Sequence, residues 1–93
     1  MSDKELEQIA QHFRLLGEPM RLKILQAVCH EPLTVTEIVE ATGATQANVS
    51  KHLALLAMAG ILTRKKDGQN VYYGMEDQLT VKMCELVRSH LAH

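Results

Sequence analysis

Two short helical segments separated by a glycine constrain this chain more than any other feature of its sequence. The first is predicted over residues 35–42, because Thr34 and Glu37 have the spacing of a capping box. Gly43 interrupts the pattern, and a second helix is predicted over residues 46–59. Two helices joined by a tight turn that contains glycine form a helix-turn-helix. The sequence therefore predicts this motif in the middle of the chain.

The period of the apolar residues changes after the second of these helices. Residues 61–66 and 69–73 are predicted to form two strands. Asp67-Gly68 lies between them, and this dipeptide is typical of the tight turn in a β-hairpin. A hairpin that directly follows a helix-turn-helix is a wing, so we expect one here.

Three further helices complete the predicted fold. Ser2 and Glu5 have capping-box spacing and begin the first, and Pro19 lies in the first turn of the second. The last helix is predicted to begin within residues 76–79 and to run to the C-terminus. We therefore expect a mainly α fold with a small β-hairpin wing. This is a winged helix-turn-helix of five helices, in one domain over residues 1–93.

Composition excludes several classes of protein. Apolar residues make up 46% of the chain, which argues for a folded domain rather than a disordered one. No stretch is long and apolar enough to span a bilayer, and two cysteines are too few for a disulfide framework. We therefore expect a cytoplasmic protein without a membrane partner. The chain has no phosphate-binding glycine loop and no nucleophile motif, so we expect no enzyme activity.

The start of the second helix of the motif is polar and carries no acidic residue. In a helix-turn-helix this helix enters the major groove, and its first turns meet the base edges. Amide side chains can bind adenine through two hydrogen bonds, and hydroxyl groups can meet donors or acceptors. The candidate DNA-contacting residues of this helix are Thr45, Gln46, Asn48, Ser50, Lys51 and His52.

The predicted wing carries basic residues beside a polar turn. Its candidate DNA contacts are Arg64, Lys65, Lys66 and Gln69. Such side chains would bind phosphate and give salt-dependent affinity, even though the net charge of the chain is −1. Winged helices also serve as protein-interaction modules, and this alternative stays open.

Three stretches of the chain resemble the ArsR/SmtB family of winged helix-turn-helix transcriptional repressors. LGEPMRLKIL over residues 16–25 resembles the family opening L-x-x-P-x-R-L-x-I-L. QANVSKHLALL over residues 46–56 is similar to the family's recognition helix, and GILTRKKDGQNVYY over residues 60–73 to its wing. The resemblance implies a homodimer built from the first and last helices. Such a dimer would repress transcription by binding an inverted-repeat operator in double-stranded DNA, and an inducer would release it.

The apolar residues of the last helix also indicate a dimer. They cover about half of the helix circumference, which is more than one buried face requires. They are Leu79, Met83, Cys84, Leu86, Val87 and Leu91. The surplus predicts a second buried surface, most simply a dimer interface. We expect Leu6, Ile9 and Phe13 to pack against Val87 and Leu91 of either protomer.

The sequence alone leaves the inducer unknown, and the resemblance implies a divalent metal as one candidate. Zinc, cobalt and nickel sensors of the family carry Asp-x-His at the start of the last helix and His-x-x-His or His-x-x-Glu at its end. Asp77, His90 and His93 match three of these four ligand positions, and Leu79 occupies the fourth. Imidazole and carboxylate ligands suit zinc or nickel.

A thiol-reactive signal is the alternative inducer. The only thiols are Cys29 and Cys84, and the pattern of the family's persulfide sensors would place cysteines at Gln26 and Ala92 instead. Small apolar packing residues are the other interpretation of these two cysteines. The remaining histidines include His12, which has no partner pattern and is expected on the surface.

Overall fold

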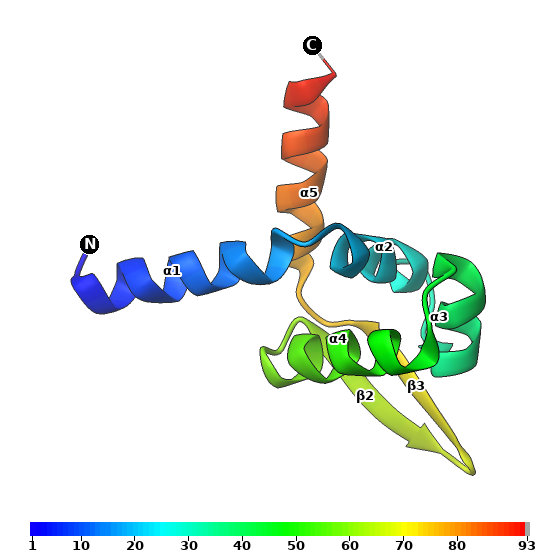
Figure 1. Ribbon diagram of the computed structural model, residues 1–93. Coiled ribbons are helices and arrows are strands. Elements are labelled where there is room, and N and C mark those ends of the chain that lie inside the picture. Colours follow the sequence, from blue (N-terminus) through cyan, green and yellow to red (C-terminus); the bar gives the residue numbers. More distant parts are fainter. Residues whose placement is uncertain (93) are drawn as a thin grey trace.

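A computed structural model describes residues 1–92 of the chain, and it contains five helices and three strands in that range (Figure 1). The elements in chain order are α1 (Asp3–Leu16), α2 (Pro19–Val28), β1 (Leu33–Thr34), α3 (Val35–Thr42), α4 (Gln46–Met58), β2 (Leu62–Asp67), β3 (Asn70–Met75) and α5 (Gln78–Leu91). The predicted mainly α fold with a hairpin wing is confirmed. No helix among the described residues has the length and apolar character needed to cross a bilayer.

Both predicted capping boxes are present. In the first, the Glu5 backbone N–H donates to Ser2 Oγ at 3.1 Å, and the Ser2 N–H donates to Glu5 Oε1 at 2.9 Å. Thr34 and Glu37 make the equivalent pair at the start of α3. The hydrogen bond from the Ser2 N–H, aided by the Ser2 hydroxyl, lowers the pKa of the exposed Glu5 carboxyl below its usual value.

A left-handed glycine makes the turn between α3 and α4. Gly43 ends α3 with a φ of 75°, a conformation that costs little only for glycine. Its N–H donates to the carbonyl of Val39 at 2.9 Å, which satisfies one of the last free carbonyl groups of α3. Thr45 then begins α4 as its N-cap. The tight turn predicted from the sequence is therefore formed.

The sheet has one strand more than expected. β1 pairs antiparallel with β3, with Leu33 opposite Tyr73, so the strand order is β1-β3-β2. Two residues are too short a run to show strand periodicity, which is why β1 was not predicted. The hairpin turn also lies one residue further along than predicted, because Asp67 pairs with Asn70 and the loop is Gly68-Gln69.

The core is aliphatic and lies between α2, α3, α4 and the start of β2. Its buried residues are Leu15, Ile24, Leu25, Val28, Ile38, Val49, Leu53, Leu56, Ile61 and Leu62. The core therefore holds α4 on one side of the molecule with the hairpin beside it (Figure 1).

α1 and α5 extend away from this core in different directions (Figure 1). Leu15 is the buried residue of α1, and Thr80 is the buried residue of α5. The molecule consequently measures 44 × 33 × 21 Å, which is elongated for a chain of this length.

Candidate nucleic-acid interface

One face of α4 is buried and the other is polar and exposed. Val49, Leu53 and Leu56 are fully buried, so this side of the helix lies against the core. Five of the six predicted DNA-contacting residues of this helix are exposed: Thr45, Gln46, Asn48, Ser50 and Lys51. The exposed face therefore offers amides, hydroxyls and one ammonium group to a partner.

Thr45 also stabilises the start of α4. Its Oγ1 accepts a hydrogen bond from the Asn48 backbone N–H at 3.2 Å. The other free N–H groups of the first turn leave a partial positive charge at this end of the helix, where α4 has no acidic residue. This end of α4 therefore suits contact with a phosphate group.

His52 does not belong to the exposed face, and its prediction as an exposed contact is wrong. The residue is only 8% exposed and lies between α4 and α2. Arg21 Nε donates to His52 Nδ1 at 3.2 Å, and His52 Nε2 lies 3.4 Å from Glu18 Oε2. These partners lie about 30 positions earlier in the chain, so no local pattern could show that the imidazole is turned inward.

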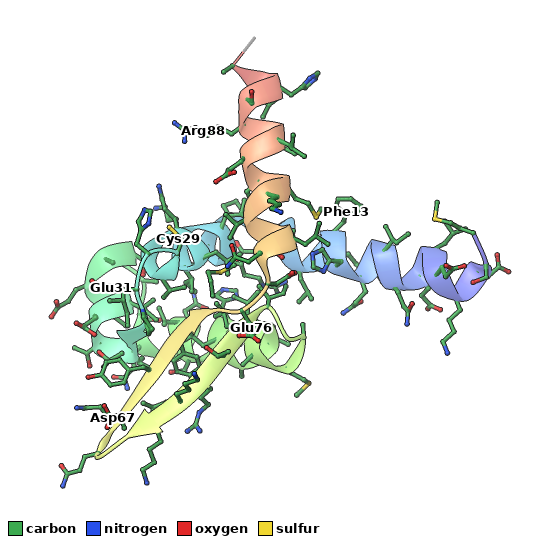
Figure 2. All side chains as sticks on the ribbon, turned by 180° about the vertical axis from the view of Figure 1, so that it is seen from behind. Phe13, Cys29, Glu31, Asp67, Glu76 and Arg88 are labelled. Atoms are coloured by element: carbon green, nitrogen blue, oxygen red, sulfur yellow. The ribbon has the colours of Figure 1, made fainter. Side chains whose placement is uncertain are left out.

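The wing carries its basic residues along an exposed hairpin. Arg64, Lys65 and Lys66 are exposed on β2, and Gln69 is exposed in the turn. Because side chains alternate between the two faces of a strand, Arg64 and Lys66 share one face and Lys65 lies on the other. Figure 2 shows Asp67 at the tip of this hairpin, far from α1 and α5.

Asp77 and His90, two of the predicted metal ligands, do not meet within one chain. Asp77 is the N-cap of α5, whereas His90 lies in its last turn. The 14 residues of α5 separate these ends by about 21 Å at a rise of 1.5 Å per residue. No group of three or more metal-binding side chains occurs within residues 1–92. His93 lies outside the described residues.

Asp77 already has partners at the base of α5. Its Oδ1 accepts from the Leu79 N–H at 3.1 Å, and its Oδ2 accepts from Thr80 Oγ1 at 2.6 Å. His12 of α1 joins this group, with Nε2 at 3.4 Å from Thr80 Oγ1 and 3.9 Å from Asp77 Oδ2. No local pattern could pair His12 with α5, because the contact spans most of the chain. His12 is half-buried rather than a surface residue.

The two thiols are exposed and unpaired within the described residues. Cys29 follows α2 as its C-cap, and Cys84 lies in the middle of α5. Neither is a buried packing residue within one chain. The interpretation of both as small apolar packing residues therefore does not hold within a single chain.

Apolar side chains are also exposed on the two helices that leave the core. Phe13 is 57% exposed, Leu86 is 71% exposed and Leu91 is 76% exposed. Leu6, Ile9 and Val87 are exposed as well. Figure 2 shows Phe13 beside the angle between α1 and the start of α5. The first and last helices thus present unburied apolar surface of the kind that marks an interaction site.

The fold and this face together define a winged helix-turn-helix regulator. A model of the family described as "Bacterial regulatory protein, arsR family" matches residues 18–64, which include α2, α3 and α4. The chain belongs to this family, whose members are transcriptional regulators and not enzymes.

Two of its relatives are described as repressors. The chain is 35% identical to the "Probable mercury resistance operon repressor" of Streptomyces lividans, over 85% of this chain and 63% of the relative. It is 29% identical to the transcriptional repressor SmtB homolog of Synechocystis sp., over 98% of this chain and 69% of the relative. The chain thus spans about two thirds of the length of these relatives.

A solved structure shares the whole fold. The solution NMR structure of a homodimeric winged helix-turn-helix DNA-binding domain from Mycobacterium bovis superimposes with a TM-score of 0.84 at 25% identity. The superposition covers 99% of this chain and 88% of that one.

Proposed function

We propose that this chain is a transcriptional repressor that binds operator DNA as a homodimer, with α4 in the major groove and the wing on the adjacent backbone. The observation that carries the proposal is the exposed face of α4, where amide and hydroxyl groups stand without a carboxylate beside a basic hairpin. Amides and hydroxyls supply base contacts, and the basic side chains supply phosphate contacts. The relatives described as repressors support the proposal that this chain represses transcription.

The exposed apolar residues of α1 and α5 support the homodimer. Their burial needs a second surface, and the family neighbour with the same fold is homodimeric. A twofold dimer would place two α4 helices on half-sites about 34–36 Å apart, so the operator should be an inverted repeat. Each half-site alone would bind too weakly for regulation.

A gel-retardation or anisotropy titration tests the proposal, with duplexes from the DNA upstream of the gene and a scrambled duplex of equal length. We expect tighter binding to the upstream DNA and a steep loss of affinity with salt. A protein that retards neither duplex at low salt would instead be an interaction module, and this result would overturn the proposal.

For the inducer we propose a zinc or nickel ion held between protomers. Asp77 of one protomer would act with His90 and His93 of the partner subunit, because antiparallel pairing of two α5 helices brings opposite ends together. The donor types fit these metals. The fit is incomplete, since Leu79 has no donor atom and both Asp77 oxygens already accept hydrogen bonds. The mercury resistance relative supports a metal signal in general.

A zinc titration of the wild type and of the His90→Ala, His93→Ala double variant tests this site. His30→Ala is the matched control, because His30 is exposed but lies far from α5 in the chain. We expect the double variant to lose zinc affinity and zinc-dependent release of DNA, whereas the control keeps both. Equal zinc affinity in all three proteins would exclude the site. The exposed thiols of Cys29 and Cys84 would then be the remaining candidates for the signal.

A further inference from the structure

A polar cluster of three side chains joins α1, α2 and α4 beneath the proposed DNA-binding face. Glu18 and Arg21 come from the start of α2, and His52 comes from α4. The His52 side chain is nearly buried. Buried polar groups need hydrogen-bond partners, so the positions of these three residues depend on one another.

Arg21 connects this cluster to the end of α1. Its Nη1 donates to the carbonyl of Leu15 at 3.4 Å and to the carbonyl of Arg14 at 3.5 Å. These carbonyls belong to the last turn of α1, where few backbone N–H groups remain to bind them, and the Arg14 carbonyl also accepts from the Gly17 N–H at 3.3 Å. The guanidinium charge also stabilises the negative end of the α1 dipole. One side chain thereby contacts α1 through Nη1 and α4 through Nε.

The hydrogen bonds determine which nitrogen of His52 carries the proton. Arginine has donors only and stays charged, so His52 Nδ1 must be the acceptor in its bond with Arg21. The proton of the neutral ring is then on Nε2, which lies 3.4 Å from Glu18 Oε2. This oxygen is buried and accepts no hydrogen bond within the described residues, so Nε2 is the polar group that faces it. Glu18 Oε1 meanwhile accepts from the Met20 N–H and caps α2.

His52 lies next to the DNA-binding face on the helix surface. At 3.6 residues per turn, His52 is one turn after Asn48 and about 40° around the axis from it. The apolar residues of α4 resist rotation only through non-directional packing. The bond between Arg21 and His52 is directional, so it can set the angle at which Asn48 points.

We propose that His52 is a positioning residue, which fixes the rotation of α4 relative to the end of α1 through its hydrogen bond with Arg21. It would hold the DNA-reading helix in register with the helix that carries Phe13 and the proposed dimer surface. This inference rests on the proposed DNA binding, and its test therefore includes a readout that does not involve DNA.

The test compares substitutions at both ends of the hydrogen bond. His52→Leu keeps a side chain of similar size but removes the acceptor, and we expect a loss of operator affinity of about tenfold. The salt dependence should not change, because no phosphate contact is lost. His52→Asn keeps an acceptor for Arg21 and should recover most of the affinity. Arg21→Ala combined with His52→Leu should be no worse than the more harmful single change, because both act through one bond.

Val28→Ala is the control for general loss of stability, since it opens a cavity in the same core two turns of α2 away from Arg21. All affinities are measured well below the melting temperature of each variant. If His52→Leu weakens operator binding no more than Val28→Ala does, or if the two single changes add, the positioning role is overturned. A lower salt slope in His52→Leu would also overturn it, because the imidazole would then be contacting DNA.

The tautomer of His52 gives the readout without DNA. Long-range nitrogen-15 spectra of the wild type should show an unprotonated Nδ1 and a protonated Nε2, and Arg21→Ala should remove this preference. The opposite tautomer in the wild type would contradict the hydrogen bond on which the inference depends. Failure of the proposed function is a separate outcome, in which the wild type binds no DNA but the tautomer is as stated.

Discussion

At the residue scale, the proposed DNA-binding face of α4 carries more amide and hydroxyl groups than charges. Gln46 and Asn48 are exposed in the first turn of α4, which is the part of a helix-turn-helix that meets base edges. Lys51 is the one charged side chain on this helix. Base discrimination should therefore come from amide hydrogen bonds, and Lys51 should add affinity without sequence preference.

Replacing Asn48 by Ala should reduce discrimination among operators rather than all DNA binding. A two-bond amide–adenine contact contributes about 1–3 kcal/mol of preference for the correct base. Affinity for the operator should fall by that amount, while affinity for scrambled DNA stays unchanged. Gln26→Ala, an exposed glutamine on α2, is the control. Equal losses on operator and scrambled DNA would contradict this role for Asn48.

Glu5 should titrate at lower pH than an ordinary glutamate. The Ser2 hydrogen bonds depress its pKa in the folded chain, so their contribution to the stability of α1 is present above the unfolded value, about 4.3. It is lost as the pH falls through the lower folded value. An NMR titration of the Glu5 carboxyl should show this, and Ser2→Ala should raise the pKa towards the ordinary value. Identical titrations in both proteins would refute the capping box in solution.

At the element scale, the wing and α4 have separate tasks. β2 and β3 carry the basic side chains outward, while the apolar start of β2 anchors the hairpin in the core. The two elements can therefore be altered independently. Changes between Arg64 and Asn70 should leave the fold intact, because every residue in this range is exposed.

Lys65→Ala and Lys66→Ala should weaken binding to every duplex by similar factors. Each lost phosphate contact should lower the slope of log affinity against log salt by about 0.9. Titrations at several salt concentrations measure this slope, and Lys23→Ala, an exposed lysine on α2, serves as the control. A selective loss on operator DNA with an unchanged slope would mean that the wing reads bases.

The elements that sequence reasoning predicted are those with local signals. Capping boxes begin α1 and α3, Gly43 makes the turn, and the period of the apolar residues separates the helices from the hairpin. β1 was missed because its only reason to be a strand is its pairing with β3. His52 was assigned to the wrong face for the same reason, since its partners Glu18 and Arg21 lie in another helix.

At the scale of the whole molecule, the apolar surface that a single chain leaves exposed predicts a dimer as the functional unit. α1 and α5 project from the core with their apolar residues unburied (Figure 1). A short chain has a small core, and association with a second copy adds buried surface. The same association would present two α4 helices to one duplex.

Leu86→Glu should split the proposed dimer and abolish operator binding while the fold survives. Leu86 is 71% exposed in the single chain, so a charge there costs nothing until a partner covers it. Sedimentation should show dimers for the wild type and monomers for the variant. Leu22→Glu places the same charge on an exposed leucine of α2 and should leave the dimer intact. A wild type that sediments as a monomer at micromolar concentration would contradict the interface.

The most direct test of the account is a footprint of the wild-type dimer on DNA selected from a random duplex library. Sequence-specific repression requires that selection enrich an inverted repeat whose half-sites are about one helical turn apart. Protection should cover both half-sites, and the contact pattern should have twofold symmetry. Enrichment of no sequence, or of a site without symmetry, would contradict a homodimer that reads DNA through α4.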